Sequence, residues 1–149
     1  MLQKILFSLL LISLAACSKT SPQPDSSDKF AEMAKIRQRL QTKLGPEYDQ
    51  PVAAATPEQI THGKRLYEKA CATCHGPDGK PRPYMIQSLV KPPANLASAK
   101  IANFYSERAR IDIIKNGISG TPMKGWRGML TDEDILCVFM FTRTLIKEN

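Results

Sequence analysis

The 149-residue sequence predicts an all-α fold in which three main helices are joined by long loops. Two observations support this prediction. Apolar residues recur at helical spacing in several segments, and most of these segments begin with a residue that can cap a helix. No segment shows the alternation of apolar and polar residues that is typical of a half-buried strand.

The N-terminal segment has the features of an export signal. Lys4 supplies a positive charge, and about ten apolar or small residues follow, far fewer than the roughly 20 that a membrane-spanning helix needs. The segment ends in Leu-Ala-Ala-Cys, which resembles the bacterial lipobox, whose cysteine is acylated and becomes the first mature residue. We therefore expect residues 1–16 to be a lipoprotein signal peptide and Cys17 to be lipidated. An ordinary cleaved signal with a chance cysteine is the alternative.

Residues 17–55 are expected to form a lipid-anchored tether. The stretch after Cys17 is rich in Ser, Pro and Asp, a composition typical of flexible linkers. An amphipathic helix is predicted over 29–44, and Gly45 with the following proline ends it. This helix either docks on the domain or stands exposed, and its thin apolar stripe favours weak docking.

The compact domain is expected over residues 56–149. Thr56 is a good N-cap, and the proline and glutamate after it suit the first turn of a helix that continues to residue 70. Gly63 inside this helix costs about 1 kcal/mol relative to alanine, which a close crossing by another helix would explain.

Two further helices are predicted in the domain. Ser106 is a suitable N-cap for the first of them, and Gly117 stands just past its end. Thr131 and the three acidic residues after it begin the last helix. The stretch over 76–96, rich in proline and glycine, is expected to be a long ordered loop with at most one short helical turn.

The residues 71–76, CATCHG, form the most specific motif in the chain. In a C-x-x-C-H sequence each thiol can add across a porphyrin vinyl group, and the histidine that follows can reach the iron. We therefore expect Cys71 and Cys74 to hold one covalent haem c and His75 to be an axial ligand. A thioredoxin-type pair would need a βαβ setting, and a zinc site a second ligand pair, neither of which the sequence offers.

The second iron ligand is predicted to be Met123. A six-coordinate haem needs such a ligand. Met123 lies in the turn-rich GISGTPMKGW loop, 48 residues after His75, and the proline before it stiffens the backbone. Met129 in the same loop is the next candidate. His62 is a weaker one, because the helix that carries it leads directly into the haem motif.

From about residue 56 to residue 146 the chain resembles a small class I c-type cytochrome. The matching pieces are CATCHG, PPANL, NGISGTPM and DEDILCVFMFTRTL. The resemblance implies three main helices and long loops wrapped around one covalently bound haem. It also implies that the first and last helices cross near Gly63 and Phe141.

The resemblance also implies roles for single residues. The backbone carbonyl of Pro93, or of the proline before it, should accept a hydrogen bond from the ring of His75 and raise its basicity. Separately from the resemblance, we expect Trp126 and Tyr84 to line the haem pocket, with simple core packing as the alternative for Trp126. Cys137 stands where family members often have alanine, so we expect a buried thiol; a reactive thiol is the alternative.

The charge distribution suggests acidic partners. The formal net charge is +7, yet no basic stripe is interleaved with aromatic residues, so nucleic-acid binding is not expected. A positive rim near the haem edge would instead favour redox proteins with acidic docking surfaces. The expected rim residues are Lys80, Arg82, Lys91, Lys124 and Arg127.

These features predict an electron-transfer protein rather than an enzyme. The sequence favours a one-electron carrier, tethered by lipid to the periplasmic side of a bacterial membrane, that passes electrons between respiratory-chain partners. A fixed cytochrome subunit of a dehydrogenase, oxidase or reductase is the alternative. A haem-based gas sensor is a less favoured one.

Overall fold

The computed structural model describes residues 26–147, and over this range the predicted all-α fold is confirmed. It contains helices and isolated β-bridges but no strand. The predicted signal peptide and Cys17 lie outside the described residues. None of the described helices is both long enough and apolar enough to cross a bilayer. The elements are α1 (Ser26–Leu44), the 3-10 helix η1 (Gly45–Glu47), α2 (Pro57–Ala70), α3 (Ala72–His75), α4 (Pro83–Ser88), α5 (Ala99–Ala102), α6 (Glu107–Asn116) and α7 (Asp132–Thr144).

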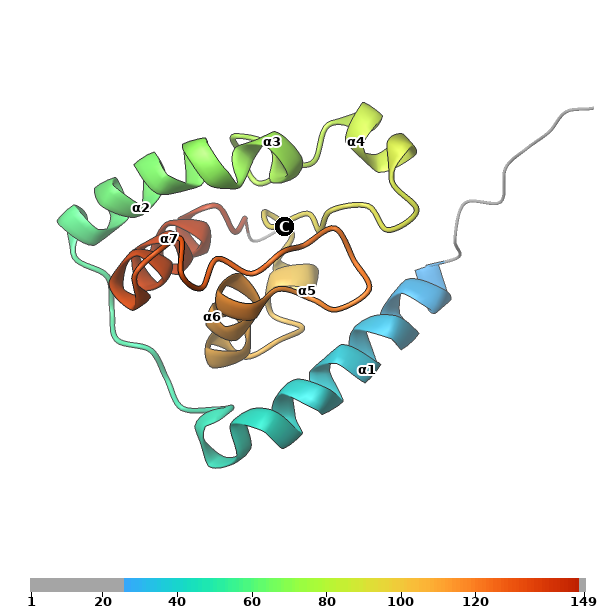
Figure 1. The fold of residues 1–149 in the computed structure, drawn as a ribbon, viewed down its shortest axis with the longest axis horizontal. Helices are drawn as coiled ribbons and strands as arrows, with labels where there is room; N and C mark the ends of the chain where they lie inside the picture. Colours follow the sequence, from blue (N-terminus) through green and yellow to red (C-terminus); the bar gives the residue numbers. More distant parts are fainter. Residues whose placement is uncertain (1–25, 148–149) are drawn as a thin grey trace, which may run out of the picture.

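The centre of the fold is the crossing of α2 and α7, which lie against each other in Figure 1. A Cβ atom added to Gly63 would lie 1.9 Å from the carbonyl oxygen of Cys137, so only glycine allows this approach. Beside the crossing, the rings of Tyr67 and Phe141 pack with centroids 5.2 Å apart. The expected crossing near Gly63 and Phe141 is therefore confirmed.

The predicted starts of the three main helices are confirmed by their caps. The Thr56 hydroxyl accepts a hydrogen bond from the Gln59 N–H, and the Gln59 side chain accepts one in return from the Thr56 N–H. Thr131 and Asp134 form the same capping box at α7. Ser106 caps α6 through its side chain. Because these bonds satisfy N–H groups that the helix leaves unpaired, the chain enters each helix at a defined residue.

Helix α7 supplies much of the core. Ile135, Val138 and Phe139 are each at most 1% exposed. Cys137 is also buried, as expected for a thiol that acts as a small apolar side chain. Burial raises the pKa of this thiol, and the nearby carboxylates add to the effect, so it remains protonated at neutral pH.

Helix α1 packs on the domain. It begins at Ser26, three residues before the predicted start at residue 29, and it ends at Leu44 as expected. Ile36 and Leu40 are buried in one apolar cluster with Tyr48 and with Ala109 of α6. Of the two arrangements that the sequence left open, docking is therefore correct and the exposed stalk is wrong. The thin apolar stripe of α1 is completed by apolar residues of α6 and by Tyr48, which follows η1.

Candidate haem site

The two motif cysteines and the histidine share one short turn. Helix α2 ends at Ala70, and the next four-residue helix, α3, follows it directly in Figure 1. The N–H of His75 donates to the carbonyl of Cys71 at 2.9 Å, which closes this turn. Cys71 and Cys74 are unpaired, half-buried thiols. The residue types, their spacing and their free sulfur atoms fit thioether attachment of a haem.

The ring of His75 is oriented by a backbone carbonyl, but not the predicted one. Its Nδ1 lies 3.0 Å from the carbonyl oxygen of Ala94, so Nδ1 carries the proton and donates it. The expectation of Pro93 is wrong by one residue. Successive carbonyls of a non-helical segment point in different directions, and the turn that begins at Asn95 decides which of them faces the ring.

This contact leaves Nε2 of His75 as the nitrogen that can bind iron. Burial lowers the pKa of His75, while the hydrogen bond to Ala94 acts in the opposite direction. The neutral imidazole is the form that ligates metals. Burial, and next the neighbouring Cys74, raise the pKa of Cys71 to about 11, so its thiol is uncharged at neutral pH.

A glycine turn follows α3 and is hydrogen-bonded to the segment whose Ala94 carbonyl orients the His75 ring. Gly76 has φ +75°, and a Cβ atom there would lie 2.1 Å from the carbonyl oxygen of Lys80. The fully buried Tyr67 donates its hydroxyl to the Gly76 carbonyl at 2.7 Å, and Leu96 N–H donates to the Gly79 carbonyl at 2.8 Å. The sequence does not reveal this role of Tyr67, because the hydroxyl binds a backbone carbonyl whose position depends on the folded turn.

The loop that carries Met123 is closed by its own hydrogen bonds. Gly117 ends α6 with φ +74°. The N–H of Ile118 then donates to the carbonyl of Met123 at 2.9 Å, and the N–H of Met123 donates to the Thr121 hydroxyl at 3.1 Å. Met123 is half-buried. In Figure 1 this loop extends from α6 and α7 on the side where α3 and α4 lie.

The second half of the loop returns to the last turn of α6. Trp126 N–H donates to the carbonyl of Ile114 at 3.0 Å, and its side chain is half-buried. A Cβ atom on Gly125 would lie 2.5 Å from the carbonyl carbon of Asn116, so the backbones touch here. This attachment limits how far the Met123 loop can move away from α6.

Other methionines and Tyr84 have different surroundings. Met33 of α1 and Met140 of α7 are buried in helix packing, whereas Met129 is 66% exposed. Tyr84 lies on α4 and is 61% exposed. The predicted pocket roles of Tyr84 and Trp126, and the ligand role of Met123, stay predictions.

His62 joins α2 to α7 instead of serving as a ligand. Its Nε2 lies 2.7 Å from a carboxylate oxygen of Asp134, and its Nδ1 lies 3.2 Å from the guanidinium of Arg65. Both ring nitrogens therefore have partners. The hydrogen bond between His62 and Asp134, together with the capping bonds from Thr131, lowers the pKa of Asp134. The sequence offers no signal for this contact, because His62 and Asp134 lie on different helices.

The expected positive rim is changed by two contacts. Lys91 forms an ion pair with Glu32 of α1, and the Arg127 guanidinium donates to the side-chain oxygen of Asn116. The remaining rim residues, Lys80, Arg82 and Lys124, are exposed.

Comparison with known proteins identifies the family. Residues 58–140 match the family model described as cytochrome c oxidase, cbb3-type, subunit III, and this range includes both the CATCHG turn and the Met123 loop. The chain belongs to this family of c-type cytochromes. Covalently bound haem c is the cofactor of such proteins, and Cys71 and Cys74 are the cysteines present for its attachment.

A solved structure shows a weaker similarity to the chain. One solved structure, named KustC0563 c-type cytochrome, is 28% identical to this cytochrome. It covers 57% of this chain and 98% of its own, with a TM-score of 0.49. No curated protein matches the chain.

Proposed function

We propose that this cytochrome is a one-electron carrier that is tethered by lipid at Cys17 to the periplasmic side of a bacterial membrane, with His75 and Met123 as iron ligands. The haem iron, when bound, supplies the chemistry by changing between Fe(III) and Fe(II). The single observation that carries the proposal is the pair of constrained ligand segments, the Ala94 contact on one side and the closed Met123 loop on the other.

Two strong ligands suit electron transfer. His75 and Met123 would together hold the haem iron and leave no coordination site for oxygen, and the bound haem would then change oxidation state with little movement of these two side chains. The Ala94 carbonyl restrains the imidazole of His75, and the hydrogen bonds at Thr121 and Ile118 restrain the backbone of Met123. A thioether ligand raises the reduction potential relative to a second imidazole.

Exposed cations support docking on an acidic redox partner. Lys80, Arg82 and Lys124 are exposed, and they lie in segments next to the two ligand-bearing turns. Charges of this kind increase association rates at low salt and act less beyond the Debye length, which is about 8 Å at physiological ionic strength. Electron transfer to an acidic partner should therefore slow as salt increases.

The docked α1 shortens the tether. Residues 18–25 separate Cys17 from Ser26, and a chain of that length spans at most about 30 Å when extended. Since α1 is packed against α6, it does not add its own length to this reach. We infer a domain that stays close to the membrane surface and exchanges electrons with membrane-bound partners.

The ligand assignment is tested by Met123→Ala in the holoprotein. We expect loss of the methionine–iron charge-transfer band and a lower midpoint potential, because the thioether is removed. Met129→Ala is the matched control from the same loop and should change neither quantity. An unchanged band and potential in Met123→Ala would reject the assignment.

A second candidate function is a fixed subunit of a respiratory complex. The matched family is named after a subunit of an oxidase, and the short tether also suits a fixed position. Affinity purification from solubilised membranes separates the two candidates. Stoichiometric recovery of a large catalytic partner, retained at high salt, would support the subunit; recovery of the cytochrome alone would support the mobile carrier.

A further inference from the structure

We propose that α1 positions both axial ligands, holding the segment that orients His75 through Glu32 and the loop that carries Met123 through Ile36 and Leu40. The inference rests on the proposed ligation of the iron by His75 and Met123. Its structural part, that α1 restrains both segments, can be tested separately.

The first contact reaches the His75 side. The carboxylate of Glu32 lies 2.5 Å from the ammonium of Lys91, and both side chains are partly exposed. Lys91 stands three residues before Ala94, whose carbonyl accepts from the His75 ring. Between them are Pro92 and Pro93, whose rings fix φ and make this stretch stiff. A displacement of Lys91 is therefore passed on to the Ala94 carbonyl.

Aromatic and cation–π contacts hold the same end of α1 in place. The ring of Phe30 lies 5.8 Å from that of Phe104, which follows α5. The ammonium of Lys100 lies 4.5 Å from the centroid of the Phe30 ring, and the guanidinium of Arg37 lies 4.5 Å from that of Phe104. Glu32 thus belongs to a turn of α1 that is anchored on both sides, which favours a fixed geometry for its ion pair.

The second contact reaches the Met123 side. Ile36 and Leu40 form the buried cluster with Ala109, and the half-buried Ile118 packs against this cluster. Ile118 opens the ligand loop, and its N–H donates to the carbonyl of Met123 at 2.9 Å. The packing of α1 therefore supports the residue that closes the Met123 loop.

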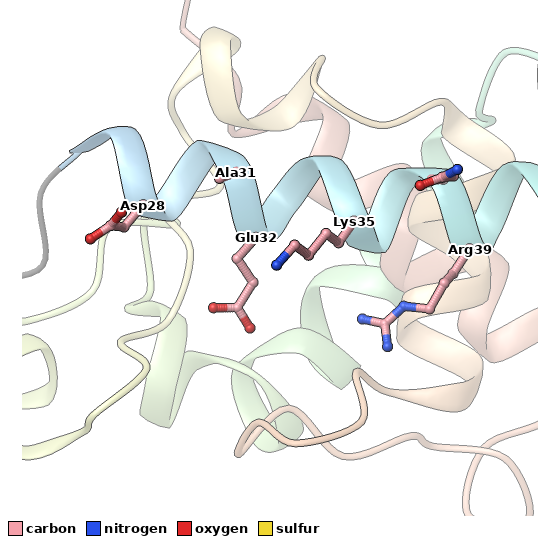
Figure 2. Close-up of a pocket in the computed structure, with 6 residues that line it drawn as sticks. Asp28, Ala31, Glu32, Lys35 and Arg39 are labelled. Atoms are coloured by element: carbon pink, nitrogen blue, oxygen red, sulfur yellow. The ribbon is translucent and has the colours of Figure 1, made fainter.

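Figure 2 supplies a matched control for the ion pair. The side chains of Glu32, Lys35 and Arg39 extend to one side of α1. Lys35 is exposed and lies one turn after Glu32 on the same side of α1. Its substitution therefore tests whether a change of charge near Glu32 alters the midpoint potential by itself. The groove along this side of α1 is lined by Asp28, Ala31, Glu32, Lys35, Gln38 and Arg39.

The ion pair is tested with Glu32→Gln, Lys91→Gln and the swapped pair Glu32→Lys with Lys91→Glu, all as full-length holoproteins. Each single variant should speed amide exchange in residues 89–97 and raise the midpoint potential, since a weaker hydrogen bond makes the His75 ligand less basic. The swap should restore both quantities, and Lys35→Gln should change neither. Opposite potential shifts in the two single variants, with amide exchange in residues 89–97 unchanged, would show a charge effect only and overturn the inference.

The apolar contact is tested with Ile36→Ala, and with Ile36→Val as a milder variant. We expect faster exchange in residues 118–123, a weaker methionine–iron band and a lower potential, with Val between wild type and Ala. The exposed Gln38→Ala is the control. Unchanged exchange in 118–123 overturns the inference. If Met123→Ala leaves the band intact, the proposed ligation fails, and the exchange data still decide whether α1 restrains the two segments.

Discussion

The crossing of α2 with α7 and the docking of α1 on α6 are two helix contacts of different kinds. At the crossing, the backbones approach at Gly63, and the surrounding side chains of Tyr67 and Val138 are buried. At α1, contact is made by side chains such as Ile36 and by an ion pair between Lys43 and Asp112 at 2.8 Å.

The difference concerns which part of the site each contact controls. The crossing fixes the end of α2, from which the haem-binding turn follows without a break, so the turn depends on it directly. The α1 contact lies at the edge and reaches the ligand segments through intermediate residues. We expect damage at the crossing to affect the whole domain, and damage at α1 to loosen the site locally.

The largest effect is expected for Gly63→Ala. The added methyl would overlap the Cys137 carbonyl, and relieving this overlap requires α2 and α7 to separate. We predict a loss of roughly 3 kcal/mol in the free energy of unfolding, measured by denaturant titration of the holoprotein. Lys64→Ala, on the exposed side of the same helix, should be close to neutral. A loss of equal size in both variants would contradict the close crossing.

An intermediate effect is expected for Leu40→Ala. This substitution removes buried apolar atoms from the cluster between α1 and α6 and should destabilise that contact by about 2 kcal/mol. Hydrogen exchange should rise in α1 and in residues 118–123 before it rises in α2 and α7. Gln41→Ala is the exposed control. Uniform loss of protection throughout the domain would show that the two contacts unfold as one unit.

The smallest effect is the pH dependence of the link between His62 and Asp134. The hydrogen bond from His62, followed by those from Thr131, holds the pKa of Asp134 below its ordinary 3.8. The ionised carboxylate therefore contributes stability above pH 3.8, and this contribution is lost as the pH falls through the lower folded pKa. Because the group is partly exposed, we expect about 1 kcal/mol.

The measurement compares wild type with Asp134→Asn by urea unfolding from pH 6 down to pH 3. The difference in free energy should be largest at the upper end and shrink at the lower end. His62→Gln should reproduce part of it. A difference that stays constant with pH would mean that ionisation of Asp134 contributes nothing to the crossing.

Much of this architecture could be predicted from local sequence signals. The caps at Thr56, Ser106 and Thr131 act within one turn of chain, so their neighbours in sequence are also their partners in space. The CATCHG motif is local in the same sense, since its groups share a single turn. Gly63 could be predicted as a crossing point because glycine inside a helix is destabilising, and a close approach by another helix explains its presence there.

What sequence reasoning missed depends on contacts between distant segments. Whether Pro93 or Ala94 faces the His75 ring depends on how the loop after α4 meets α3. The partner of His62 lies 72 positions further along the chain.

Short stretches of the sequence therefore determine which residues can bind and ligate a haem. They also determine where the helices begin. The reason is that covalent attachment and helix capping each involve only a few neighbouring residues. The orientation of the His75 ring and the contact of α1 with α6 are decided only when the helices pack. The reason is that these depend on which carbonyl, carboxylate or apolar side chain folding brings within a few ångströms, and one residue of register changes the answer.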